Sequence, residues 1–537
     1  MKFAKTTAAL TIVAISFANP TNPTDPFPTV DLGYATHVPT YINETSSGFR
    51  YANYNNIRFA EPPLGALRFR RPKTPPPKQY GIQNGSAPRF ATDCVSAVPG
   101  IFPDLGIGTR SWGREDCLFL NVRVPEGAKE GDNLPVIHWV HGSAFVYGSK
   151  DFKEAVGDGS GLYDDLDPSS QKFIYVASNY RMGLYGWSSS PSEDMSANVG
   201  LHDTLAALRW TQKYISKFGG DPRRITAFGH SAGAGMINLL LVARGGHEDL
   251  PFSQAFIASP AVWPRREPSR RQAMFNEVLK AANCTSVDCL REASEATLLN
   301  ANTHLIVDLS GTYSGALGPG AGFTPVVDGK YIEDLLPVLL QRGKYNRRIK
   351  KLAASNMAHD GALMVPLEGM PEIFPEYVRG TIPNASNETI ERIRSLYSYP
   401  PELPIKLGWD WATDVVFACN AYLTAKAYAN RSQRHVMSMS PAAHGQDLNY
   451  WFFQNNITTP VANVTMARQF QEYVRRFVTG ARNTMTFKRL EDWPLYGWSE
   501  TVFNVTSRGF ERQRDYWEQN QRCQILGDII DDPENGA

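Results

Sequence analysis

The stretch from Arg224 to Leu241 decides the fold and reads Arg-Ile-Thr-Ala-Phe-Gly-His-Ser-Ala-Gly-Ala-Gly-Met-Ile-Asn-Leu-Leu-Leu. Residues 225–228 are β-branched or apolar and predict a strand, while the apolar residues of 234–241 predict a helix. Between them lies a G-x-S-x-G pentapeptide with Ser231 at its centre. A serine at such a tight strand-to-helix turn needs glycine neighbours, because the turn strains its backbone and leaves no room for side chains. This order predicts Ser231 as an exposed nucleophile at the end of a strand.

A second turn of small residues precedes this stretch. The apolar run 134–140 is typical of a strand and leads into His-Gly-Ser-Ala-Phe at 141–145. Small residues let backbone amides converge on one substrate oxygen, as an oxyanion hole requires. The candidate donors are the amides of Ser143 and Ala144, together with the amide of Ala232 at the start of the helix. An ordinary loop after the strand is the alternative for 141–145.

From Pro135 onward, short β-branched or apolar runs alternate with longer helical patterns. Such alternation is typical of parallel strands joined by helices. We therefore expect an α/β fold with a large, mostly parallel central sheet flanked by helices. No stretch resembles an interdomain linker, so residues 19–537 are expected to form one domain. The expected strands are 136–140, 173–178, 225–228, 255–259, 352–355 and 435–439, with a helix over 201–215 and a loop over 317–322.

The N-terminus has the features of a secretory signal peptide. Lys2 and Lys5 precede an apolar run from Ala8 to Phe17, and Ala18 follows, with Ser16 two residues before it. This pattern predicts cleavage after Ala18. A membrane anchor is the alternative, but a span needs about 20 apolar residues and this run is shorter. No later run is long enough either, so we expect a secreted chain without a transmembrane anchor.

Glycosylation signals and cysteines agree with secretion. The chain has six cysteines, an even number, which in an oxidising compartment favours disulfides over free thiols. Sequence alone leaves many pairings of these cysteines open. Nine N-x-[S/T] sequons occur, more than chance predicts, and we expect glycans on many of them. They are Asn43, Asn84, Asn283, Asn384, Asn387, Asn430, Asn456, Asn463 and Asn504.

Composition argues against other classes of protein. Lysine and arginine number 54 against 53 aspartates and glutamates, with no basic block along the chain, so we expect no nucleic-acid partner. No histidine cluster lies at zinc-ligand spacing, and we expect no metal site. With 42% apolar residues, the chain has ample material for a large core.

Five further stretches occur in the order typical of one family: Phe59–Phe69, Glu115–Asn121, Asn179–Arg181, Asn198–Asp203 and Phe218–Pro222. With the serine pentapeptide they make the chain resemble the type-B carboxylesterase/lipase family, the cholinesterase-like α/β-hydrolases, and most closely its secreted fungal members. The resemblance covers nearly the whole chain after the leader. It implies an α/β-hydrolase fold with lid or gorge insertions. It also implies hydrolysis of small-molecule or lipid carboxylic esters through an acyl-enzyme, without a cofactor.

The resemblance also implies an acid and a base. The family's acid lies in an N-x-x-[D/E]-G stretch after a strand, which here makes Asp360 the candidate. The family's base lies in a small-residue turn before a glycine and an apolar strand, which here makes His444 the candidate. The order Ser, Asp, His is the one that this fold requires. His359 is a weaker rival base and Asp447, expected on the strand after His444, a weaker rival acid. Trp451, Phe452 and Phe453 are expected in the core.

The family pattern also pairs the cysteines as Cys94 with Cys117, Cys284 with Cys289, and Cys419 with Cys523. The first pair would close the loop 95–116 over the entrance to the site. The apolar residues of this loop either form a lid or gorge rim there or have only a structural, lining role. Trp112 lies in this loop and offers an aromatic face.

Two departures from the family pattern bear on the substrate. Where the family commonly has glutamate before the nucleophile and a second glycine in the oxyanion turn, this chain has His230 and Ser143. The first change removes a negative charge beside the reacting centre, and His230 either faces the pocket or packs into the protein. Two alternatives to a hydrolase stay open: an enzyme that transfers the acyl group or modifies a metabolite, and a non-catalytic cholinesterase-like binding protein.

Overall fold

The computed structural model describes residues 27–103, 105–152, 157, 159–166, 170–309, 322–365, 369–480 and 490–537. The predicted leader, residues 1–18, and all but the last residue of the predicted loop 317–322 lie outside these ranges.

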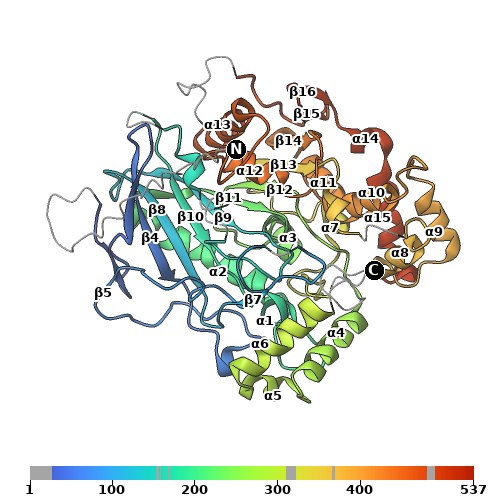
Figure 1. The fold of residues 1–537 in the computed structure, drawn as a ribbon, viewed down its shortest axis with the longest axis horizontal. Coiled ribbons are helices and arrows are strands. Elements are labelled where there is room, and N and C mark those ends of the chain that lie inside the picture. The colour runs from blue at the N-terminus through green and yellow to red at the C-terminus, as the bar shows by residue number, and fades with distance from the viewer. Residues whose placement is uncertain are drawn as a thin grey trace, which may run out of the picture.

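An eleven-stranded sheet forms the centre of the molecule, in the order β16-β15-β14-β13-β12-β11-β9-β10-β8-β4-β3 (Figure 1). The seven neighbouring strands β15, β14, β13, β12, β11, β9 and β10 pair in parallel, and the strands at both edges of the sheet pair antiparallel. Two short sheets, β1-β2-β5 and β6-β7, lie outside it. The predicted fold class, a large and mostly parallel sheet flanked by helices, is confirmed.

The sheet strands are β3 Tyr41–Glu44, β4 Arg50–Arg58, β8 Phe119–Pro125, β9 Leu134–Val140, β10 Ile174–Ser178, β11 Gly220–His230, β12 Gln254–Ala258, β13 Lys351–Met357, β14 Ser432–Met437, β15 Thr501–Thr506 and β16 Gly509–Arg514. The short strands are β1 Val30–Asp31, β2 Thr36–His37, β5 Ile82–Gln83, β6 Ser96–Ala97 and β7 Ser111–Trp112. The helices are α1 Gly183–Trp187, α2 Val199–Tyr214, α3 Ala232–Gly246, α4 Pro268–Ala281, α5 Val287–Glu292, α6 Glu295–Thr303, α7 Leu336–Gln341, α8 Phe374–Thr381, α9 Asn387–Arg394, α10 Lys406–Ala412, α11 Cys419–Tyr428, α12 Gln446–Trp451, α13 Val464–Thr479, α14 Tyr516–Asn520 and α15 Arg522–Asp531.

Both faces of the sheet are covered, because side chains alternate between the faces along each strand. On β9, Val136 and Val140 join the core beneath α2 and α3, whereas Ile137 and Trp139 join the core beneath α12 and α13. Figure 1 shows these two pairs of helices on opposite sides of the sheet. Each fully buried aliphatic or aromatic side chain stabilises the fold by roughly 1.5–3 kcal/mol, so the sheet is a rigid platform for its end loops.

The six expected strands all form, as β9 to β14, and the helix expected over 201–215 is α2. The prediction of a strand after His444 is wrong, because residues 446–451 form helix α12. Gly445 turns the chain in a left-handed conformation, and the Trp451 indole then donates to the Asp447 carboxylate one helical turn earlier, at 3.0 Å. As expected, Trp451, Phe452 and Phe453 are buried.

Three disulfides form in the pairing that the resemblance implies: Cys94–Cys117, Cys284–Cys289 and Cys419–Cys523. The last ties α11 to α15. Within the described ranges, no helix is long and apolar enough to cross a membrane.

Candidate active site

Three neighbouring parts of the sheet bring Ser231, Asp360 and His444 together. Ser231 directly follows β11, Asp360 follows β13, and His444 follows β14, so all three lie beyond the carboxyl ends of parallel strands. The carboxyl ends of parallel strands meet at one edge of a sheet, where ligands bind in open α/β folds. His444 Nε2 lies 2.8 Å from Ser231 Oγ, and His444 Nδ1 lies 2.6 Å from Asp360 Oδ1.

Ser231 sits on a strained turn. Its backbone has φ 55° and ψ −123°, outside the regions that side-chain-bearing residues usually occupy. The turn packs the helix directly against the strands: a Cβ atom on Gly233 would lie 2.0 Å from the carbonyl oxygen of Val140, and one on Gly229 would lie 2.7 Å from the backbone of Gly233. The two glycines of the pentapeptide are therefore required by close packing.

The Asp360 carboxylate is fully buried and is held by three donors. Its Oδ1 accepts the hydrogen bond from His444, while its Oδ2 accepts from the Ser259 hydroxyl at 3.0 Å and from the Met357 amide at 2.8 Å. A carboxylate held in this way requires a proton on His444 Nδ1, which leaves Nε2 free to accept the proton of Ser231. Ser259 follows β12 and was missed by sequence reasoning, because no motif marks it.

The rival residues take other partners. The amide of His359 bonds to the Ala442 carbonyl, and its ring lies 6.4 Å from the Trp409 ring rather than beside Ser231. Asp447 contacts His230 and Trp451, not His444. The His444 ring instead packs on Phe417, with ring centroids 4.5 Å apart.

The turn after β9 has an unusual backbone. Ser143, Ala144 and Phe145 have φ values of 82°, 54° and 64°, a run of three left-handed residues without glycine. The Tyr180 hydroxyl lies within hydrogen-bond distance of the carbonyls of His141 and Gly142, at 3.1 and 3.0 Å, and holds the start of the turn. Such strain beside a nucleophile is typical of sites that pre-organise their backbone amides.

A cavity of about 350 Å³ opens over Ser231 and His444. Ser143 and Ala144 line it together with His230, and apolar side chains form most of the rest of its wall. Three described residues of the loop 95–116, Phe102, Pro103 and Leu105, contribute to this wall. Trp112 does not line the cavity: it is buried and stacks on Phe152, which does line it. The other apolar lining residues are Trp139, Tyr147, Phe152, Ala261, Trp263, Met364 and Leu448.

His230 faces both the cavity and a buried carboxylate. Its Nε2 lies 3.4 Å from Asp447 Oδ1, and its ring centroid lies 4.9 Å from that of His444. Burial alone would raise the pKa of Asp447, but the neighbouring His230 and the hydrogen bonds to the carboxylate lower it to about 2. Asp447 is therefore ionised at neutral pH. His230 therefore both lines the pocket and packs against a buried side chain, the two alternatives that the sequence leaves open.

Comparison with known proteins identifies the family of the chain. The model of the carboxylesterase family matches residues 40–525. The chain is 30% identical to carboxylesterase patB of Penicillium expansum over 536 residues, which cover 90% of this chain and 92% of that protein. It is 26% identical to a secreted lipase of Arthroderma benhamiae over 440 residues, which cover 78% and 83% of the two chains. The crystal structure of Aspergillus niger EstA superposes with a TM-score of 0.78, covers 94% of this chain and 98% of its own, and is 23% identical. That likeness identifies the fold as the α/β-hydrolase fold.

Proposed function

Because the chain belongs to the carboxylesterase family, we propose that it hydrolyses carboxylic esters with Ser231 as the nucleophile, His444 as the base and Asp360 as the acid that orients the base. The observation that supports this most is the pair of hydrogen bonds that runs from Ser231 through His444 to Asp360.

In the first step, Ser231 Oγ attacks the ester carbonyl while His444 Nε2 takes its proton, and His444 then protonates the leaving alcohol. Asp360 stabilises the imidazolium that forms. The negative oxygen of the tetrahedral intermediate is bound by the amides of Ser143, Ala144 and Ala232, each worth on the order of 10²–10³ in rate. Water then attacks the acyl-enzyme by the same route and releases the acid.

Cavity size and lining support a compact, uncharged ester as the substrate. A volume of about 350 Å³ lies near the lower end of small-ligand sites, roughly 300–1,000 Å³, and the walls are largely apolar. A series of p-nitrophenyl esters should therefore give the highest kcat/KM with short to medium acyl chains. A kcat/KM that keeps rising to long chains would contradict this.

Secretion and glycosylation are supported by the three disulfides, by the secreted fungal relative and by the exposure of the sequons. Seven of the nine sequon asparagines are exposed, and the other two, Asn43 and Asn504, are half-buried. Protein recovered from culture medium should begin at Asn19 and lose mass on treatment with an N-glycosidase. An intact leader on recovered protein would contradict the cleavage site.

The decisive test of the nucleophile is Ser231→Ala. The variant should fold normally, lose hydrolysis of p-nitrophenyl butyrate and lose labelling by a fluorophosphonate probe. Ser253→Ala, which removes a partly exposed hydroxyl outside the cavity, is the matched control and should keep both. Labelling that survives in Ser231→Ala would refute the assignment.

A further inference from the structure

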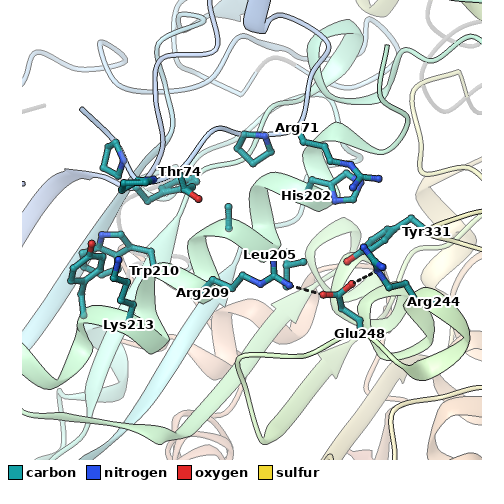
Figure 2. A pocket seen from close by; sticks show the side chains of 16 residues that line it. Arg71, Thr74, His202, Leu205, Arg209, Trp210, Lys213, Arg244, Glu248 and Tyr331 are labelled. Carbon is teal, nitrogen blue, oxygen red and sulfur yellow. Dashed lines mark hydrogen bonds and ion pairs between the residues drawn. The ribbon is translucent and has the colours of Figure 1, made fainter. Parts of the chain in front are cut away.

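We propose that a second cavity, built on α2 and separate from the candidate active site, binds a small organic acid through its carboxylate. This cavity has a volume of about 280 Å³ and shares none of its described lining residues with the cavity over Ser231. Its walls are one face of α2, the proline-rich segment 71–76, the end of α3 and Tyr331 (Figure 2).

Positive charge exceeds negative charge in this cavity. Glu248 is buried and pairs with Arg209 at 2.6 Å and with Arg244 at 3.0 Å, so it occupies both guanidinium groups but neutralises only one of their two charges. Within the described part of the chain, Arg71 has no carboxylate partner, and its guanidinium carbon lies 5.8 Å from the centroid of the Tyr331 ring. Lys213, at the far end of α2, likewise pairs with no carboxylate among the described residues. The unpaired charge attracts an anion. Arg71 and Arg244 both lie beside the Tyr331 ring, at 5.8 and 5.9 Å, and of these two Arg71 is the one without a carboxylate partner in the described chain.

Two buried side chains in the wall have polar atoms without a partner. His202 and Tyr331 are only 6% and 3% exposed, and their rings lie 4.4 Å apart. Neither His202 Nε2 nor the Tyr331 hydroxyl makes a hydrogen bond within the described structure. Burial, with the nearby guanidinium groups, lowers the pKa of His202 to about 3, so its ring is neutral and can donate one hydrogen bond. Buried polar atoms are rarely left unpaired, and a ligand oxygen would satisfy these two.

The arrangement matches a monoanion with an apolar body. A guanidinium binds a carboxylate through two parallel hydrogen bonds, and Figure 2 shows Arg71 beside His202, with Tyr331 on the same side of the cavity. Because Arg209 and Arg244 pair with Glu248, Arg71 offers the guanidinium without a carboxylate partner among the described lining residues, and the apolar wall beside it favours an organic acid over inorganic phosphate. From here the wall continues along α2 over Leu205 towards Trp210, an apolar path for the rest of the ligand.

Isothermal titration of the full chain with 3-phenylpropionate tests the site, with 3-phenylpropanamide and inorganic phosphate as comparison ligands. We expect saturable binding of the acid, and binding at least tenfold weaker for the neutral amide and for phosphate. Arg71→Ala should weaken binding of the acid at least tenfold, because a charge-assisted hydrogen bond is lost. Tyr331→Phe, which removes only the hydroxyl, should weaken it several-fold.

Lys73→Ala is the matched control: Lys73 is exposed, lies two residues from Arg71, pairs with Glu61 and does not line the cavity. It should bind the acid as the native chain does. Thermal melting checks that all variants fold. The absence of saturable binding, native affinity in Arg71→Ala, or phosphate binding as tight as that of the acid would each overturn the proposal. Since the readout is binding and Arg71 lies outside the cavity over Ser231, the result does not depend on the proposed nucleophile.

Discussion

Replacing Asp360 with asparagine would test how the buried acid sets the proton position on His444. In the native structure, Oδ2 of Asp360 faces the Met357 amide, which can only donate a hydrogen bond, and the Ser259 hydroxyl, while Oδ1 faces His444 Nδ1. The new amide oxygen must therefore take the Oδ2 position, because an NH₂ group there would face the Met357 N–H and leave it unpaired in a fully buried site. The NH₂ group then points at His444.

An NH₂ group in that place donates to His444 Nδ1 and forces the proton of the ring onto Nε2. Nε2 then donates towards Ser231 and cannot accept its proton. We expect kcat/KM for p-nitrophenyl butyrate at pH 7 to fall about 10⁴-fold, equivalent to about 5.5 kcal/mol of transition-state stabilisation. Stability should change by no more than about 2 kcal/mol, because the shape and two of the three hydrogen bonds are kept.

Asp447→Asn is the matched control, since Asp447 is an equally buried carboxylate that contacts His230 instead of His444. It should lose far less activity than Asp360→Asn. The double variant Asp360→Asn, His444→Ala should be only slightly less active than His444→Ala alone, because the two residues act as a unit. If Asp360→Asn keeps more than about a tenth of the native kcat/KM, or if the losses multiply in the double variant, the reasoning is wrong.

Three further predictions concern stability and selectivity. In the folded protein the pKa of Asp447 is about 2, below its ordinary value of 3.8, so the ionised carboxylate stabilises the fold by roughly 2 kcal/mol above about pH 4, and this stabilisation is lost as the pH falls from 4 to 2. Urea unfolding of Asp447→Asn should lack this part of the pH dependence, and an unchanged dependence would contradict the prediction. The disulfide Cys419–Cys523 spans 104 residues, so replacing both cysteines with serine should lower the free energy of unfolding by about 4 kcal/mol. A loss below about 1 kcal/mol would show that closing this loop contributes little to stability. Because no described residue lining the cavity over Ser231 is a carboxylate and His230 lies there, butyrylcholine should have a lower kcat/KM than 3,3-dimethylbutyl butyrate; a higher value would point to a cholinesterase.

Much of the architecture follows from local patterns. The alternation of short apolar runs with helical stretches predicts the parallel sheet, and the structure confirms it, because strands and helices are selected largely by the periodicity of nearby side chains. The exception is the stretch after His444, where apolar residues suggested a strand and the chain forms α12. Short apolar runs do not distinguish the two, and here a left-handed Gly445 and the bond from Trp451 to Asp447 decide for the helix.

By itself the sequence determined which residue types are available for ester hydrolysis, the turn that carries Ser231 and the family to which the chain belongs. Only the tertiary structure decided which side chains meet. Ser231 and Asp360 lie 213 and 84 residues from His444, and they come together because β11, β13 and β14 end at the same edge of one sheet. The Ser259 hydroxyl on Asp360 and the unpaired Arg71 beside Tyr331 depend on the same long-range packing, which no local pattern of residues records.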